Sequence, residues 1–429
     1  MRSRSVTPPQ HAYSAALPLE IQFDIIDEFE GQTAHLRELC RVCLAWAEHA
    51  QMLLFRNIGL RFEDRKRFLA VLNTKHNLGR HVKALKIFED HVDLHHFRLL
   101  AELALILPRL CTLDFSHTYF SRRAPSRLLQ SATIRDAVSR ICLHSCAFED
   151  AETLIAFVAA FPRLESLYIC YCDWEDNGSQ LCSKIARPAW HFKYLALGYM
   201  PQSTFIDWMA AEPAALTADH FRIMSFVPNA SMFNALLDRI GDGLRHLDLP
   251  NGVGGRGMWG TNSLPTEIPL SIRGCTTLTT LTFRGGRFLN PGSNIIPSVL
   301  ARVASTSPLL AAVFFHIPLD TGYFVGPWEQ VDTRLDAITS LERVEFRVFQ
   351  GDPTVAHRFA PYAMAVLHLE RRMGLLQARG LLRFIDADPG EGQTSVYVLT
   401  PLPEPPRPRH KFLRRLWGWM SRVGVFIPF

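Results

Sequence analysis

The sequence has no long apolar run, no strong excess of one charge and no secretory signal. Its most apolar segment, residues 101–107, is far shorter than the ~20 residues that a membrane-spanning helix needs. The formal net charge is only +5 and both signs are mixed along the chain, so charge alone does not indicate a nucleic-acid partner. Residues 1–16 contain arginine, serine and proline but no apolar segment, and we predict a disordered tail. We therefore expect a cytoplasmic or nuclear protein, or one found in both compartments.

The sequence also lacks the motifs of common enzymes. It contains no nucleophile elbow, Walker loop or H-E-x-x-H segment. Residues 252–257 fit G-x-G-x-x-G, but the segment after them is poor helix material, and a dinucleotide site needs a helix there. His91 and His95 would share one helix face, yet no third metal ligand can be named. We expect no catalytic residues, no cofactor and no metal.

The nine cysteines, an odd number, are expected to be reduced thiols. Five lie close together without paired C-x-x-C spacing, which argues against a metal site: Cys142, Cys146, Cys170, Cys172 and Cys182. Cys146 and Cys172 occupy the same place in the repeat described next, and Asn229 occupies it too. We predict that these side chains turn inward and satisfy backbone groups of a loop.

An apolar-x-x-apolar-x-apolar unit recurs ten times between residues 62 and 400. The first five units begin 28, 28, 26 and 28 residues apart, and later spacings range from 23 to 34. The spacing is typical of leucine-rich repeats, with helical stretches such as residues 151–161, 231–240 and 295–305 between the units. We predict stacked coils with a parallel sheet on the concave side and helices on the convex side. A helix over residues 360–377 and a strand from Arg379 to Phe384 are expected to close the array. An ordinary α/β domain is the alternative. The units begin at Val82, Leu110, Val138, Leu164, Phe192, Phe221, Leu244, Leu278, Leu310 and Leu341.

Residues 17–60 precede these units and predict three short helices. Pro18 suits a first helical turn, Thr33 can cap the second helix, and a third helix begins near Val42. About 45 residues make too small a unit to be robust without a docked neighbour.

The pattern in this stretch resembles the F-box of fungal, basidiomycete-type proteins. It consists of Leu17-Pro18, Glu20-Ile21, the Ile25-Ile26 pair, Leu36, Leu39, Val42, Trp46 and Leu54-Phe55. The Arg379-Gly380-Leu381-Leu382 segment also resembles the end of such proteins. F-boxes bind the Skp-type linker of cullin-based SCF ubiquitin ligases. The resemblance therefore implies a linker contact made by Leu17, Pro18, Glu20, Ile21, Ile25, Leu39, Val42 and Trp46. The alternative is that these residues only form the core of the bundle.

The last segment combines a proline-rich linker at residues 401–408 with an amphipathic helix at residues 411–429. Two tryptophans opposite basic residues are typical of a helix in a membrane interface, but the helix can also fold back onto the last repeat. Liposome flotation with and without residues 409–429 distinguishes these two alternatives.

The predicted organisation is a tail (1–16), an F-box (17–61), an irregular leucine-rich-repeat-like solenoid (62–400), and the linker with its helix (401–429). The predicted function is a non-enzymatic substrate adaptor of an SCF-type ligase, with the Skp-type linker, the cullin ligase and an unknown target protein as partners. The alternative is a non-degradative scaffold or a membrane-proximal binding module. From outward-facing strand positions we predict target contacts at Asp114, Ser116, Tyr168, Tyr171, Asp248, Arg284 and Arg347.

Overall fold

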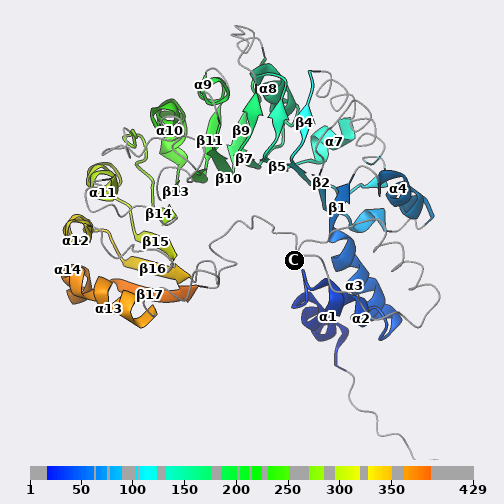
Figure 1. The fold of residues 1–429 in the computed structure, drawn as a ribbon, viewed down its shortest axis with the longest axis horizontal. Helices are drawn as coiled ribbons and strands as arrows, with labels where there is room; N and C mark the ends of the chain where they lie inside the picture. Colours follow the sequence, from blue (N-terminus) through cyan, green and yellow to red (C-terminus); the bar gives the residue numbers. More distant parts are fainter. Residues whose placement is uncertain are drawn as a thin grey trace, which may run out of the picture.

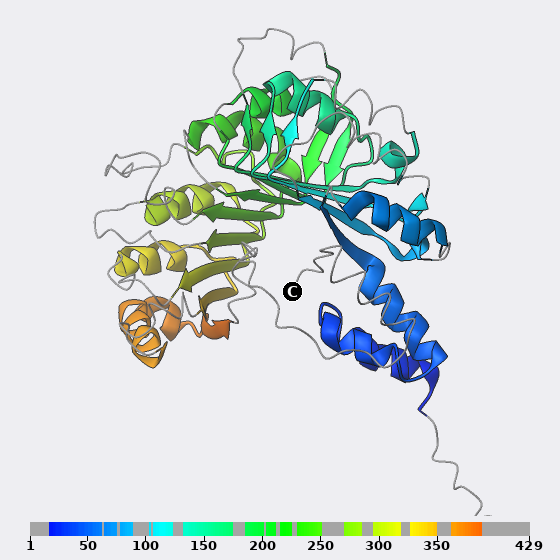
Figure 2. The ribbon, with the colours of Figure 1, turned by 45° about the vertical axis from the view of Figure 1, so that its right-hand side comes forward.

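The computed structural model describes residues 17–61, 64–74, 78–88, 103, 106–122, 132–174, 185–200, 203–211, 215–224, 230–250, 270–284, 295–318, 327–349 and 362–387. The described elements form an arc, with strands on its inner side and helices on its outer side (Figure 1). A small helical bundle lies at one end of the arc, and the last strand and two helices lie at the other (Figures 1 and 2).

The N-terminal bundle contains three helices: α1 (Leu19–Asp27), α2 (Thr33–Leu39) and α3 (Leu44–Arg56). Ile26, Leu36 and Leu54 are buried between them. The prediction that Thr33 caps the second helix is wrong. Thr33 is the first helical residue, Gln32 precedes it without a side-chain cap, and the Thr33 hydroxyl has no hydrogen-bond partner among the described residues.

A parallel sheet of twelve strands runs through the rest of the described chain, and its strands lie side by side in the order of the sequence. The remaining strands belong to two smaller sheets. Neighbouring strands pair without a register shift at equivalent apolar positions, so each predicted apolar unit stacks directly on the next. This is the connectivity of a solenoid, in which each coil contacts mainly its neighbours. The strands are β1 (Asn57–Arg61), β2 (Ala84–Phe88), β3 (Thr112–Ser116), β5 (Arg140–His144), β7 (Ser166–Cys170), β10 (Tyr194–Gly198), β12 (His220–Ile223), β13 (His246–Pro250), β14 (Thr280–Arg284), β15 (Ala312–Pro318), β16 (Arg343–Phe349) and β17 (Leu382–Ala387).

The bundle is continuous with this sheet. Helix α3 ends at Arg56, and β1 begins at the next residue and pairs with β2. The first strand of the sheet therefore falls inside the predicted 17–61 unit.

The outer layer of the arc is helical. It contains α4 (Arg65–Thr74), α7 (Ala132–Ala137), α8 (Ala151–Ala159), α9 (Thr204–Ala210), α10 (Asn234–Ile240), α11 (Ile295–Thr306), α12 (Trp328–Asp336), α13 (Tyr362–Arg372) and α14 (Gly374–Ala378). The prediction of one helix over residues 360–377 is wrong, because the backbone leaves the helical region at Met373 and divides it into α13 and α14. Two small parallel sheets were not predicted: β4 (Tyr119–Phe120), β6 (Ala147–Phe148) and β8 (Asp173–Trp174), and β9 (Trp190–Phe192) with β11 (Leu216–Ala218).

Stacked phenylalanines connect the last coils through the core. The ring centroids are 5.3 Å apart for Phe283 and Phe315, 4.8 Å for Phe315 and Phe346, and 5.4 Å for Phe346 and Phe384. Trp328 of α12 packs edge-on against the two central rings. Aromatic pairs in such geometries add about 0.5–1.5 kcal/mol each beyond the area that they bury.

Strained residues follow four successive strands. His117, Ser145, Tyr171 and Tyr199 all have φ between 52° and 56°, a conformation that side chains other than glycine rarely adopt. The N–H groups of His117 and Ser145 donate to carbonyls of the next coil, at 3.0 and 2.9 Å. These bonds between coils offset part of the cost of the left-handed turn.

The predicted inward orientation of Cys146 and Cys172 is confirmed, but the carbonyls that they satisfy belong to strands and not to loops. Both side chains are buried. The Sγ of Cys146 donates to the carbonyl of Phe115 at 3.4 Å, and the Sγ of Cys172 donates to that of Leu143 at 3.7 Å. Each thiol therefore satisfies a carbonyl of the preceding coil.

Several predictions fall outside the described residues: the 1–16 tail, the histidines at 91 and 95, Cys182, Asn229, the glycine-rich segment at 252–257, and residues 401–429. Within the described ranges, no helix combines the length and apolar character needed to cross a membrane.

Candidate functional site

The N-terminal bundle exposes large apolar side chains. Six of them are between 41% and 78% exposed, and we call them the N-terminal apolar surface: Leu17, Leu19, Ile21, Ile25, Val42 and Leu44. Ile21 and Ile25 are four residues apart and so lie along one side of α1, while Leu17 lies just before the helix begins. Val42 lies in the turn between α2 and α3, and Leu44 is the first residue of α3. Six large apolar side chains left exposed on so small a unit are typical of an interaction surface.

The structure separates the eight predicted linker-contact residues into two groups. Leu17, Pro18, Glu20, Ile21, Ile25 and Val42 are exposed. Leu39 and Trp46 are half-buried and pack against the core. The indole Nε1 of Trp46 donates to Oε1 of Gln22, which joins α3 to α1. Leu19 and Leu44 are exposed members of the surface that the sequence analysis did not select.

Polar contacts hold the bundle together independently of the apolar surface. His49 Nε2 lies 2.8 Å from Oδ1 of Asp27, and the His49 ring stacks on Phe23 with centroids 4.3 Å apart. Arg56 donates to both carboxylate oxygens of Glu30 at 2.9 Å. These contacts join α3 to α1 and to the turn that follows α1 without using the N-terminal apolar surface.

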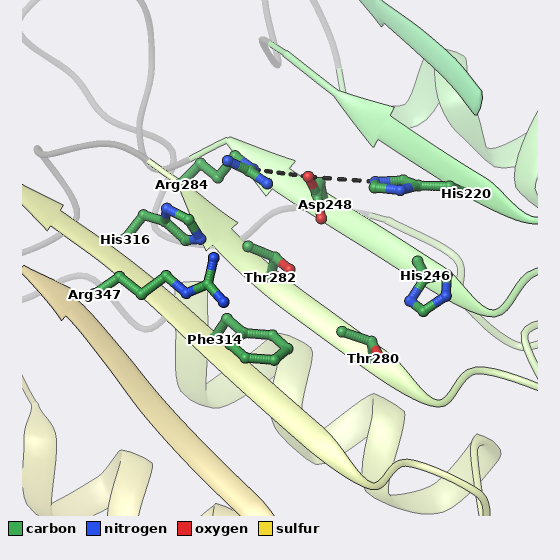
Figure 3. A pocket seen from close by; sticks show the side chains of 9 residues that line it. All are labelled: His220, His246, Asp248, Thr280, Thr282, Arg284, Phe314, His316 and Arg347. Atoms are coloured by element: carbon green, nitrogen blue, oxygen red, sulfur yellow. Dashed lines mark hydrogen bonds and ion pairs between the residues drawn. The ribbon is translucent and has the colours of Figure 1, made fainter. Parts of the chain in front are cut away.

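The second candidate site lies on the inner face of the sheet, which faces away from the helices. Side chains alternate between the two faces along each strand. Three of the seven predicted target contacts, Asp248, Arg284 and Arg347, line one pocket on β13, β14 and β16 (Figure 3). We call it the concave pocket, and its volume is about 160 Å³, room for several waters or one small polar group. Its lining residues are His220, His246, Asp248, Thr280, Thr282, Arg284, Phe314, His316 and Arg347.

Asp248 is a buried carboxylate between two basic side chains. Its Oδ2 accepts from Nε of Arg284 at 2.7 Å and lies 3.3 Å from Nε2 of His220 (Figure 3). Burial alone would raise the pKa of Asp248, but the approach of His220 and Arg284 outweighs burial and holds the pKa well below 3.8. Asp248 is therefore ionised and fixes the orientation of Arg284.

Arg347 is oriented in a similar way from the other side of the pocket. Its Nε donates to Oε1 of the buried Glu345 at 2.6 Å. The guanidinium carbons of Arg343 and Arg347 lie 4.9 and 5.1 Å from the centroid of the Phe314 ring. Such cation–π contacts pre-order the arginine side chains.

His316 lies between Arg284 and Arg347 and is 4% exposed. Its Nδ1 has no hydrogen-bond partner among the described residues. Burial lowers the pKa of His316 to about 3, and the positive charges of Arg284 and Arg347 act in the same direction. The imidazole is therefore neutral at physiological pH.

The other four predicted target contacts lie outside the pocket, three of them on other strands of the sheet and Tyr171 in the bend after β7. Asp114 and Ser116 are on β3, where Asp114 Oδ2 lies 3.6 Å from Nζ of Lys86. Burial raises the pKa of Asp114, and Lys86 offsets only part of that effect. Tyr168 is half-buried on β7, and burial raises its pKa. Tyr171 is 48% exposed and stacks on Tyr199 with centroids 4.1 Å apart.

The histidines of the concave pocket and Phe314 were not among the residues predicted from the sequence. The missed signal was positional. Arg284 and Arg347 each follow the last apolar residue of a unit, and His316 follows Phe315 in the same way. Reading every unit at that one position would have selected all three.

No family model and no curated protein matches the chain. Among solved structures, the chain is similar to a crystal structure of a TLR13–ssRNA13 complex, with 13% sequence identity and a TM-score of 0.29. The similarity covers 71% of this chain and 38% of that chain, so this chain spans well under half of the matched one. A TM-score of this size supports no inference about the chain.

Proposed function

We propose that the chain is a non-enzymatic substrate adaptor of an SCF-type cullin ubiquitin ligase. In this proposal the N-terminal bundle is an F-box that binds the Skp-type linker, and the coils are a leucine-rich-repeat-like solenoid that binds the target protein. Two features support it: the F-box resemblance of residues 17–58, and three helices in that segment that carry exposed apolar side chains.

The observation that carries the proposal is the N-terminal apolar surface. Burying one leucine-sized side chain stabilises a complex by roughly 1.5–3 kcal/mol when it is fully covered. Leu17, Ile21 and Val42 start from 55%, 45% and 60% exposure, so a partner can cover about half of each. Each residue would then contribute about 1 kcal/mol, and the surface as a whole would contribute several.

The proposed mechanism is tethering. The bundle holds the ligase, and the inner face of the sheet holds the target near the transferred ubiquitin. A tether raises the effective concentration of the target, commonly to the millimolar range for short connections, without changing any bond chemistry. Because β1 follows α3 directly, the two binding regions are joined by a regular strand and not by a loop.

A titration of the purified chain with a Skp-type linker tests the proposal. We expect saturable binding by the wild type and a loss of affinity of at least about 10-fold for the double variant Leu17→Ala/Pro18→Ala. Leu309→Ala is the matched control, because Leu309 is also 55% exposed but lies between α11 and β15 on a distant coil.

The control should bind like the wild type. Circular dichroism checks that all variants keep their helices. Absence of binding by folded wild-type protein, or equal weakening by Leu309→Ala, would contradict the proposal.

A further inference from the structure

Three consecutive strands place Arg284, His316 and Arg347 side by side on the inner face. Arg284 pairs with His316 across β14 and β15, and His316 pairs with Arg347 across β15 and β16. Since neighbouring strands lie ~4.8 Å apart, the two arginine backbones are separated by roughly 10 Å, with the histidine between them. Figure 3 shows the Arg347 guanidinium beside the His316 ring, and the Arg284 guanidinium turned toward Asp248 on the other side of the pocket.

Each arginine uses only one of its N–H donors within the described part of the chain. Arg284 donates through Nε to Asp248, and Arg347 donates through Nε to Glu345. Their terminal Nη groups make no hydrogen bond to any described residue. A guanidinium that is anchored through Nε presents its Nη donors in a fixed fork, the geometry that suits a carboxylate or a phosphoryl group.

The neutral His316 completes a set of donors. Its Nδ1 is buried without a partner among the described residues, and an unpaired buried polar atom costs about 1–3 kcal/mol. An imidazole tautomer with the proton on Nδ1 can donate to an anion placed between the arginines. Such an anion would remove this cost.

The surrounding charges favour a negative ligand. Five arginines occupy the inner-face positions of β12 to β17, against two carboxylates, Asp248 and Glu345. Both carboxylates are at most 3% exposed; Asp248 pairs with Arg284, and Glu345 pairs with Arg347 and, at 3.9 Å, with Arg343, so two negative charges face five positive ones. The five arginines are Arg222, Arg284, Arg343, Arg347 and Arg383.

We infer that the concave pocket is an oxyanion-binding site, in which Arg284 and Arg347 donate through their terminal nitrogens and His316 donates through Nδ1. The ligand is a single carboxylate or phosphoryl group, since the volume of about 160 Å³ admits a group of that size. The assignment of this group to a side chain of the target protein rests on the proposed adaptor function. The existence of the oxyanion site does not depend on that function.

Isothermal titration of the full chain tests the site with three probes: inorganic phosphate, phosphoserine and N-acetylglutamate. We expect saturable binding of at least one probe by the wild type, and a loss of at least about 10-fold for Arg284→Gln and for Arg347→Gln. The matched control is Arg245→Gln, an exposed residue just before β13 that does not line the pocket and changes the net charge equally. His316→Phe keeps the arginines, and a several-fold loss is expected from it.

The two pocket variants need a check against a folding defect. Each replacement removes the closest partner of a buried carboxylate, Asp248 for Arg284→Gln and Glu345 for Arg347→Gln, so circular dichroism checks that both variants keep the wild-type fold. A preference for phosphoserine would assign a phosphorylated target, and a preference for N-acetylglutamate would assign an acidic one. No saturable binding of any probe, or an equal loss with Arg245→Gln, would overturn the inference. Binding of the Skp-type linker should be unchanged in Arg347→Gln, so failure of this site is distinguishable from failure of the adaptor proposal.

Discussion

Gly241 lies at a close approach between the backbones of two coils of the solenoid, and we predict that Gly241→Ala weakens their contact. An ideal Cβ built on Gly241 would lie 2.6 Å from the backbone carbon of Gly274 and 2.7 Å from its oxygen. Both atoms belong to the backbone of the next coil, so no side chain can rotate away. The two coils would have to separate by several tenths of an ångström.

The magnitude follows from two opposing effects. Overpacking of this kind costs about 1–3 kcal/mol. Gly241 has φ −60° and ψ −39°, a helical conformation in which alanine is favoured over glycine by roughly 0.5–1 kcal/mol. We therefore expect a net loss of about 1–2 kcal/mol.

Gly243→Ala is the matched control. It lies two residues further along in the same turn, and its added Cβ would meet Thr217 at 3.8 Å and Ala218 at 4.0 Å, which are ordinary contacts. This substitution should change stability by less than about 0.5 kcal/mol.

Native-state hydrogen exchange is the suitable assay, because repeat arrays need not unfold in one step. In Gly241→Ala, slow amides of β13 and β14 should exchange about 5- to 30-fold faster than in the wild type, while those of β2 and β3 stay unchanged. Equal exchange in the two alanine variants would refute the reasoning, because it would mean that the coils are not held at this distance.

Three further predictions concern single side chains. The carboxylate of Asp332 accepts hydrogen bonds from two backbone N–H groups at the start of α14, at 2.9 and 3.0 Å, so Asp332→Ala should lower the free energy of unfolding in urea by about 1–3 kcal/mol. Asp336→Ala is the control and should lower it by less than about 1 kcal/mol, because the ion pair of Asp336 is exposed. Burial alone would raise the pKa of Asp150, but hydrogen bonds at the start of α8 and a nearby arginine lower it below 3.8. The stabilisation by the ionised carboxylate is therefore present above pH 3.8 and is lost as the pH falls through the lowered pKa. The unfolding free energies of the wild type and of Asp150→Asn should converge only in that acid range. Burial raises the pKa of Cys275 to about 12, so alkylation of the native protein at pH 8, read by mass spectrometry, should spare Cys275 and modify the exposed Cys43.

The strands were predictable because the repeated unit has a strict pattern. Each unit places its apolar residues on the helix-covered face, and the register of β13 to β16 aligns them one above another. The two small sheets were not predictable. Their strands are two or three residues long, too short for any periodicity to be recognised.

The candidate sites were only partly predictable, because exposure and cross-strand neighbours depend on the assembled fold. Leu44 and Trp46 are neighbours in sequence, yet Leu44 is 78% exposed and Trp46 packs on the core. Residue type alone would have predicted the opposite, with Leu44 more buried than Trp46. His316 is recognised as part of a binding site only because Arg284 and Arg347 lie on the neighbouring strands, although they are 32 and 31 residues away in the sequence.

The most direct test of the account is a hydrogen-exchange footprint of the full chain with and without a saturating Skp-type linker. We predict that protection is gained in residues 17–46, around the N-terminal apolar surface, and that exchange on β12 to β16 is unchanged and leaves the concave pocket open to a target. Protection of the inner face of the sheet with none in α1 and α3 would contradict the assignment of the two surfaces.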